Sequence, residues 1–232
     1  GLAGTGGGPG TIDTSHATGA VTGSLGSGGL VGFNFSNGTI TDSYAEGNVT
    51  GTGTVASVNT CSNDCQQVSA GGLVGMNSGA ISLSYATGNV HVSSSGVGGG
   101  LVGSNQGTIS LSYAEGAVTG AAGPAASDGS FDLATALGGF AGINRGTIDT
   151  SYATGNVGAA DVARLVAGGF VGLNSGAIFN AYASGNVTAG DFSQAGGFAG
   201  GNSVNDCNGC STQGIGVDNS ATITTALASG AV

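Results

Sequence analysis

Two glutamates come closest to a catalytic pair in this sequence. Glu46 and Glu115 occupy the same position in two copies of a repeated motif, with one copy between them. If the copies stack at strand spacing, the two carboxylates lie roughly 10 Å apart, at the upper end of the separation that glycosidases use. No neighbouring residue tunes the acid that such a reaction requires, and no Lys or Arg lies nearby for lyase chemistry. We therefore expect a solvated acidic face and no catalytic residues.

The four cysteines form two close pairs, Cys61 with Cys65 and Cys207 with Cys210. Even, close pairing in an acidic chain rich in Asn, Ser and Gly favours local disulfides and an oxidising compartment. The pairs lie about five repeat units apart, on the order of 24 Å at strand spacing, which excludes cross-pairing or a four-cysteine zinc site within one chain. A redox role for Cys207 and Cys210 would need an α/β setting that the sequence lacks.

Metal ligands are sparse. Asp128 and Asp132, beside Gly129, suit at most a weak calcium ion, because the spacing of an EF-hand loop and the calcium-binding nonapeptide are both absent. His16 takes a position that tyrosine holds in other copies and is not expected to bind a metal. We therefore expect no cofactor beyond weak calcium in the acidic loops.

These residues are embedded in a motif, G-G-[LF]-[VA]-G-x-N-x-G-x-I-x-x-S-Y-A-x-G-x-V, that recurs along the chain. Good copies begin at Gly28, Gly71, Gly99, Gly138 and Gly168, and a weaker copy flanks them at each end. Such repetition predicts a stack of about seven units of ~28 residues forming a single domain over residues 1–232. Insertions occupy residues 50–70, 119–137 and 158–167, each before the next G-G, and 203–220, between the Asn and the Ile of a copy.

The composition predicts an all-β chain. The 51 glycines follow the repeat, strand-forming Val, Ile, Thr, Tyr and Phe fill the positions between them, and no window shows helical periodicity. A unit of this length holds about three short strands, so stacking predicts a right-handed parallel β-helix. Alternation in A-x-G-x-V places Ala45, Gly47 and Val49 inside, and Glu46 and Asn48 outside.

Two polar columns follow from the repeat. The asparagine column is Asn34, Asn77, Asn105, Asn144, Asn174 and Asn202. The tyrosine column is Tyr44, Tyr85, Tyr113, Tyr152 and Tyr182. We interpret the asparagines as a structural amide ladder at a turn, and the tyrosines as a stack, with a carbohydrate-binding strip as the alternative. Alternation places the tyrosines outside, whereas a bend at Ser43 would turn them inward.

The charge balance excludes some partners. The chain has no Lys, two Arg and twelve acidic residues, for a net charge of −10. Nucleic-acid binding needs phosphate-neutralising cations, so we exclude it. Anionic membrane surfaces are disfavoured for the same reason, and no apolar run reaches transmembrane length, so we expect no membrane insertion by this segment. The chain starts and stops on repeat boundaries and shows no signal peptide, so we expect it to be a segment of a longer protein.

The repeat, as in Gly72 through Val90, resembles the GLUG motif of large secreted and surface-exposed bacterial proteins, including filamentous-haemagglutinin-like adhesins and some IgA-protease-type surface enzymes. The resemblance covers nearly the whole chain and implies an extracellular β-helical shaft or adhesin segment on a bacterial surface. It transfers no catalytic residues. The insertions and the cysteine pairs depart from the motif.

We therefore expect a non-enzymatic extracellular shaft that displays its loops to a host-cell, matrix or glycan ligand. A self-assembling extracellular fibre subunit is the alternative, because open ends of a stack offer strand edges. A carbohydrate-active β-helix enzyme lacks a tuned acid pair. An ice-binding face needs a regular threonine array, which Thr39-x-Thr41 fits and Ala80-x-Ser82 interrupts.

Overall fold

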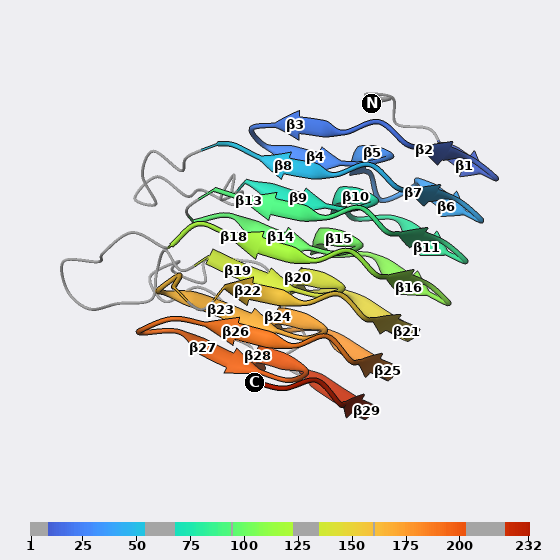
Figure 1. Cartoon of the computed structure of the whole chain (residues 1–232). Coiled ribbons are helices and arrows are strands. Elements are labelled where there is room, and N and C mark those ends of the chain that lie inside the picture. The colour runs from blue at the N-terminus through green and yellow to red at the C-terminus, as the bar shows by residue number, and fades with distance from the viewer. Residues whose placement is uncertain (1–8, 54–67, 94, 123–134, 160, 203–220) are drawn as a thin grey trace, which may run out of the picture.

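The computed structural model describes residues 9–53, 68–93, 95–122, 135–159, 161–202 and 221–232. Within these residues the regular secondary structure consists of β-strands, and every strand pairing is parallel. The coils stack in sequence order, from β1 (Thr11–Asp13) at one end of the molecule to β29 (Thr222–Ala228) at the other (Figure 1). The fold is a parallel β-helix, as the repeat predicts.

Sheet A is the longest sheet and contains two strand segments per coil in the first coils. Its eleven described strands are β1, β2 (His16–Ala17), β6 (Thr39–Thr41), β7 (Tyr44–Ala45), β11 (Ala80–Ser82), β12 (Tyr85–Ala86), β16 (Thr108–Ser110), β17 (Tyr113–Ala114), β21 (Thr147–Ala153), β25 (Ala177–Ala183) and β29. The two segments merge into one seven-residue strand from β21 onward. Sheet A therefore carries a bend in the middle of each early coil.

Three further sheets each contain six strands among the described residues. Sheet B comprises β3 (Val21–Gly23), β8 (Val49–Gly51), β13 (Val90–Val92), β18 (Val118–Gly120), β22 (Val157–Ala159) and β26 (Val187–Ala189). Sheet C comprises β4 (Gly26–Gly28), β9 (Ser69–Gly71), β14 (Val97–Gly99), β19 (Thr135–Gly138), β23 (Leu165–Gly168) and β27 (Gln194–Gly196). Sheet D comprises β5 (Val31–Asn34), β10 (Val74–Asn77), β15 (Val102–Asn105), β20 (Ala141–Asn144), β24 (Val171–Asn174) and β28 (Ala199–Asn202).

Each coil thus runs through four sheets, C, D, A and B, and not through about three strands as we expected. The difference arises at G-G-[LF], which is a tight turn between sheets C and D. A Cβ atom at Gly71 would collide with the carbonyl oxygen of Val74, and one at Gly72 with that of Gly100 in the next coil. Only glycine lets the backbone approach so closely at both positions.

The register keeps equivalent motif positions on top of one another. Ile81 pairs with Ile109, Tyr85 with Tyr113, and Val90 with Val118. Sheet C keeps the same pairing across the insertion that follows β18, where Val97 lies opposite Ala136. The strands also include the outer residues of the ranges 50–70, 119–137 and 158–167, so the connections between strands are shorter than those ranges.

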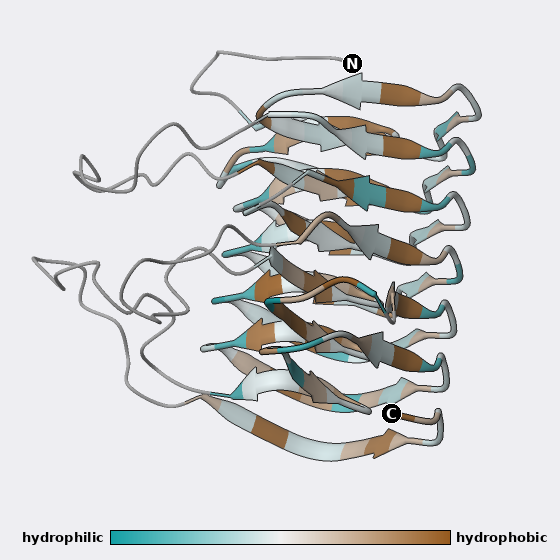
Figure 2. Cartoon of the chain, turned by 60° about the vertical axis from the view of Figure 1, so that its left-hand side comes forward, coloured by the Kyte–Doolittle hydropathy of each residue, from teal (hydrophilic) through white to brown (hydrophobic). Residues whose placement is uncertain are grey.

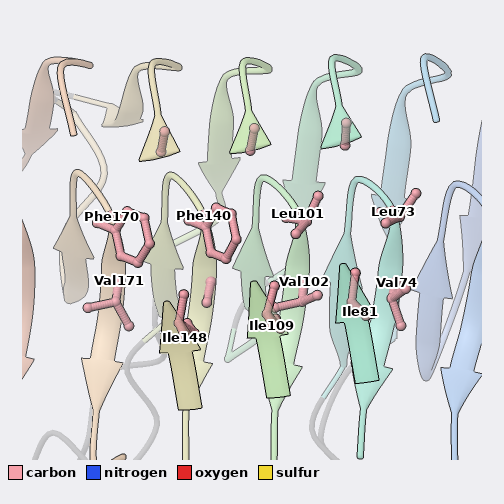
Figure 3. Packing of buried hydrophobic residues seen from close by; sticks show 14 of the residues in the cluster. Leu73, Val74, Ile81, Leu101, Val102, Ile109, Phe140, Ile148, Phe170 and Val171 are labelled. Atoms are coloured by element: carbon pink, nitrogen blue, oxygen red, sulfur yellow. The ribbon is translucent and has the colours of Figure 1, made fainter. Parts of the chain in front are cut away.

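The core consists of rows of like side chains. Between the G-G-[LF] turn, sheet D and sheet A lie fully buried Leu73, Leu101, Phe140 and Phe170, backed by the valine and isoleucine rows (Figure 3). A second cluster fills the space between sheets B and C and includes Val90, Val118, Leu137 and Leu165. Hydrophobic segments therefore recur at the same places in successive coils (Figure 2). Each fully buried aliphatic side chain stabilises the stack by roughly 1.5–3 kcal/mol.

Candidate functional site

The asparagine column forms a continuous hydrogen-bonded ladder at the corner between sheets D and A. Each side-chain amide donates from Nδ2 to Oδ1 of the equivalent residue in the next coil, from Asn34 through to Asn202, at 2.8–2.9 Å. Asn77, Asn105, Asn144 and Asn174 also donate to the carbonyl oxygen of the glycine two residues on. Asn105 and Asn144 are fully buried. This arrangement satisfies both ends of the interior amides, from Asn77 to Asn174, and leaves none of them aimed at a ligand.

The tyrosine column lies on the outer face of sheet A. Ala45 and Ala86, the next residues along, are fully buried, whereas the tyrosines are partly exposed and Tyr152 is 39% exposed. Their rings stack in parallel, with centroids 4.8 Å apart for Tyr44–Tyr85 and Tyr85–Tyr113 and 4.9 Å for Tyr113–Tyr152. His16 continues the stack at 5.0 Å from Tyr44. The ring faces are therefore turned toward neighbouring coils, and the ring edges toward solvent.

A backbone kink precedes each tyrosine. One residue per coil has a positive φ there, from Asp42 (47°) to Leu83 (52°) and Leu111 (51°). In four coils a buried serine follows the kink, and Ala181 takes this position in the coil of Asn180. The serine hydroxyl donates to a carbonyl two residues back and accepts the backbone N–H of the previous coil's serine, as in Ser84. The kink thus keeps Ser43 inside and Tyr44 outside. The tyrosine side chains therefore point outward, as strand alternation predicted, and the bend does not turn them inward.

The carboxylates lie on this same outer face. Glu46 and Glu115 are exposed, two coils apart in the column beside the tyrosines. Burial raises the pKa of Tyr85 above its ordinary value, and the negative charges of Glu46, Glu115 and Asp42 raise it further. The pKa values of Tyr113 and Tyr152 are raised in the same way, with Glu115 contributing to both. The face therefore carries a negative potential around its stacked rings.

Comparison with protein-family models found one match, described as the GLUG motif, at residues 23–50 and 164–188. Each matched range spans one coil, from sheet C through sheets D and A into sheet B. The chain carries the GLUG motif. A comparison with curated proteins found no match.

In structural terms the GLUG repeat is one turn of a four-sheet coil. Its glycines make the turn from sheet C to sheet D, its asparagine forms the inner ladder, and its Ser-Tyr-Ala segment forms the kink, the ring stack and the buried contact with the glycine turn. A Cβ atom on Gly72 or Gly100 would press on Ala86 or Ala114 respectively. All of these motif residues have a structural use.

Sequence reasoning missed two features of this GLUG solenoid. One is a second, exposed asparagine column in which Asn89 Oδ1 accepts the backbone N–H of Ala117 at 2.9 Å. Its repetition in G-N-V was visible in the sequence as Asn48, Asn89, Asn156 and Asn186. The other is the kink column, whose leucines are discussed below. Positive φ at a leucine leaves no signal in the sequence, because leucine is not a residue that favours it.

Several predicted positions lie outside the described residues. These are Cys61, Cys65, Cys207 and Cys210, the weak calcium candidates Asp128 and Asp132, and the central parts of the insertions. In the part of the chain that the structure describes, no three or more His, Cys, Asp or Glu side chains are grouped as a metal site requires. Across the same residues, no helix is long and apolar enough to span a membrane.

A shallow, open depression of about 250 Å³ lies at the corner between sheets D and A. It is lined by Ser36, Asn37 and Gly38 from one coil and by the equivalent small residues of the next two coils. Its lining contains neither a charged nor an aromatic side chain. The depression reflects the small residues of the turn and offers no anchoring group for a ligand.

Proposed function

We propose that this chain is a non-enzymatic, rigid shaft of an extracellular adhesin-type protein of a bacterial surface, and that it holds its inserted loops in a fixed array for a host-cell, matrix or glycan partner. The observation that carries the proposal is the constant register of the inner columns. The asparagine ladder and the rows of buried aliphatic side chains run from coil to coil without a change of register.

The placement of the insertions supports a display role. Three of them connect sheet B to sheet C, following β8, β18 and β22, and the strands before and after them pair as in the other coils. The fourth connects β28 to β29, from sheet D to sheet A. A solenoid tolerates insertions at its corners because the stacking of neighbouring coils is unaffected. These three insertions therefore leave and rejoin the described coils at the same corner.

A coil with a short connection between sheets B and C provides a matched way to test this. Gly51 pairs with Val92, and Ser69 with Val97, so residues 52–68 correspond to the short connection 93–96. Replacing 52–68 by the sequence of 93–96 removes one loop and keeps the coil. Likewise, Asn174 pairs with Asn202, and Ala177 with Thr222, so Ser-Gly can replace 203–221.

Beads coated with the wild-type chain, with each replacement and with the double replacement are then compared for adherence to host-cell monolayers and matrix-coated surfaces. Circular dichroism and thermal melting serve as the folding control. We expect the replacements to keep the β-sheet spectrum and to lose most of the adherence. Unchanged adherence of a folded double replacement, or no adherence of the wild-type chain to any surface, would contradict the display role.

A further inference from the structure

Two leucines stand out on the outer face of sheet A. Leu83 and Leu111 are each 54% exposed, and they follow β11 and β16, which are neighbouring strands of the sheet. The N–H of Leu83 donates to the carbonyl oxygen of Ser110 at 3.3 Å, so the two residues lie on successive coils. Two large apolar side chains are therefore presented side by side to solvent.

The backbone makes these leucines more unusual. Both have positive φ values, 52° and 51°, a region in which a bulky residue without a local polar side chain is a genuine outlier. The other coils place Thr14, Asp42, Thr150, Asn180 and Thr225 at this kink. Asparagine and aspartate adopt this conformation readily. The five other coils form the kink with a polar residue, so the fold does not require leucine at these two coils.

The surroundings of the two leucines are aromatic and acidic. Tyr85 and Tyr113, two residues further on, present their ring edges beside them. The carboxylates of Asp42, Glu46, Glu115 and Asp149 flank the two coils on the same sheet. We call the surface formed by Leu83, Leu111, Tyr85, Tyr113 and these four carboxylates the kink face. Of the chain's two arginines, Arg145 lies between β20 and β21, and Arg164 lies at the start of β23, over Phe192.

Charge and ring geometry limit the kinds of molecule that can bind the kink face. A second copy of the chain would bring the same four carboxylates against themselves, and like charges facing each other disfavour that contact. A sugar would stack on an exposed ring face, but neighbouring rings cover these faces at 4.8 Å. An apolar centre with an acidic rim is complementary to aliphatic side chains accompanied by Lys or Arg.

We propose that the kink face is a docking surface for a basic peptide segment of a partner protein that carries aliphatic side chains between its cationic residues. Its aliphatic groups cover Leu83, Leu111 and the tyrosine edges, and its cations pair with the surrounding carboxylates. The inference is independent of the inserted loops, because the loop replacements described above leave the kink face unchanged.

The test uses the full chain and three fluorescent probe peptides, monitored by anisotropy. One alternates leucine and lysine, one alternates leucine and glutamate, and one alternates serine and lysine. We expect the leucine–lysine peptide to bind, the serine–lysine peptide to bind about tenfold more weakly, and the leucine–glutamate peptide not to bind. Binding of the first peptide weakens as salt is added.

Two double variants then locate the site. Leu83→Asn with Leu111→Asn introduces the residue found at Asn180 of the same kink and is expected to weaken leucine–lysine binding about tenfold. Glu46→Gln with Glu115→Gln weakens it less and reduces its salt dependence. The matched control is Phe192→Ser, which removes a 73%-exposed side chain from a different part of the molecule and leaves binding unchanged.

Thermal melting separates binding from folding. The leucine double variant is expected to melt at or above the wild-type temperature, because asparagine suits the kink better than leucine. A lower melting temperature shows that the leucines are structural and overturns the inference. Equal binding by the leucine variant and the Phe192 control also overturns it, as does equal binding of the leucine–glutamate peptide. Dimerisation of the wild-type chain that the leucine variant abolishes would assign the face to a second copy and contradict the proposal.

Discussion

Asn105 shows how many buried hydrogen bonds a single residue of the repeat makes. Its Nδ2 donates to Asn144 and to the carbonyl oxygen of Gly107, and its Oδ1 accepts from Asn77 and from the N–H of Gly107. The amide is fully buried, so all of its hydrogen-bonding capacity is met inside the protein. The ladder therefore stabilises the stack at every coil, since loss of an interior member removes one hydrogen bond from each of its two neighbours.

We expect Asn105→Ala to lower the free energy of unfolding by about 2–4 kcal/mol, because it removes the donor to the buried Asn144 Oδ1 atom and one of the two acceptors of the buried Asn77 Nδ2 atom. Chemical denaturation monitored by circular dichroism measures this. The control is Asn89→Ala, whose exposed amide accepts the N–H of Ala117 and whose loss costs about 1 kcal/mol or less. Similar losses for the two variants would count against a special role of the inner ladder.

The glycines of A-x-G-x-V act at the level of the coil, where they set the contact between neighbouring turns. A Cβ atom on Gly116 would collide with the carbonyl oxygen of Gly88 in the preceding coil, whereas one on Gly19, in the same column, would meet nothing within 4 Å. The same motif position is therefore constrained only where another coil lies on that side.

Gly116→Ala is expected to destabilise the chain by about 3 kcal/mol or more, since backbone atoms of two coils must move apart. Gly19→Ala should change stability by less than about 1 kcal/mol and in the stabilising direction, through the entropy of the unfolded chain. The denaturation midpoints of the two variants, compared with that of the wild type, measure these changes in stability. A well-tolerated Gly116→Ala would show that the coils are less tightly stacked than the structure indicates.

The tyrosine stack gives sheet A a pH response. Burial, followed by neighbouring tyrosines and carboxylates, raises the pKa values of Tyr85 and Tyr113, and burial and Glu115 raise that of Tyr152. A raised pKa means that the folded chain keeps a proton that the unfolded chain releases first. Stability is therefore fully retained below the ordinary pKa of 10.0 and falls as the pH rises through the folded values.

Ultraviolet titration of the phenolate band should show part of the tyrosine absorbance appearing only above pH 10.0. Glu115→Gln should move the titration of all three rings downward, because this carboxylate acts on each of them. Glu46→Gln serves as the comparison, since among these three rings its charge acts on Tyr85. Identical titration curves for the wild type and the Glu115 variant would contradict the electrostatic account.

The whole molecule behaves as a one-dimensional stack, in which each coil is stabilised by the coils on either side. Phe140 stacks on Phe170 at 4.7 Å, and Phe170 stacks on Phe198 at 5.0 Å, so the rows of rings join successive coils. Phe140 is fully buried, with coils on both sides of it. Phe198 is partly buried and lies beside β28, near the last coil. A defect in the middle therefore divides the core, and a defect near β28 leaves most of it intact.

Phe140→Ala is expected to cost about 3–5 kcal/mol and to speed amide hydrogen exchange in the coils on both sides of the cavity. Phe198→Ala should cost less and should raise exchange only in the coils near β28 and β29. Exchange measured by mass spectrometry resolves the two patterns. Uniform loss of protection across the chain in both variants would argue for a single cooperative unit in place of a neighbour-coupled stack.

The repeat alone was enough to predict parallel stacking, because a short motif that recurs along the chain buries its apolar residues only when equivalent positions lie on top of one another. The inside positions of Ala45 and Val49, and the outside position of Glu46, followed from alternation within a strand. These inferences depend on local periodicity, which the order of residues records directly.

Other features depend on contacts between coils and were decided only by the folded chain. At Gly71 and Gly72 the backbone packs so closely against atoms of the same and the next coil that only glycine fits. The tight turn that results separates sheet C from sheet D and gives each coil a fourth sheet. The kink before Ser43 fixes the tyrosines outside, and it exposes Leu83 and Leu111 as neighbours although they are far apart in sequence. A backbone angle at leucine and the distance between two coils are properties of packing, and so no sequence pattern records them.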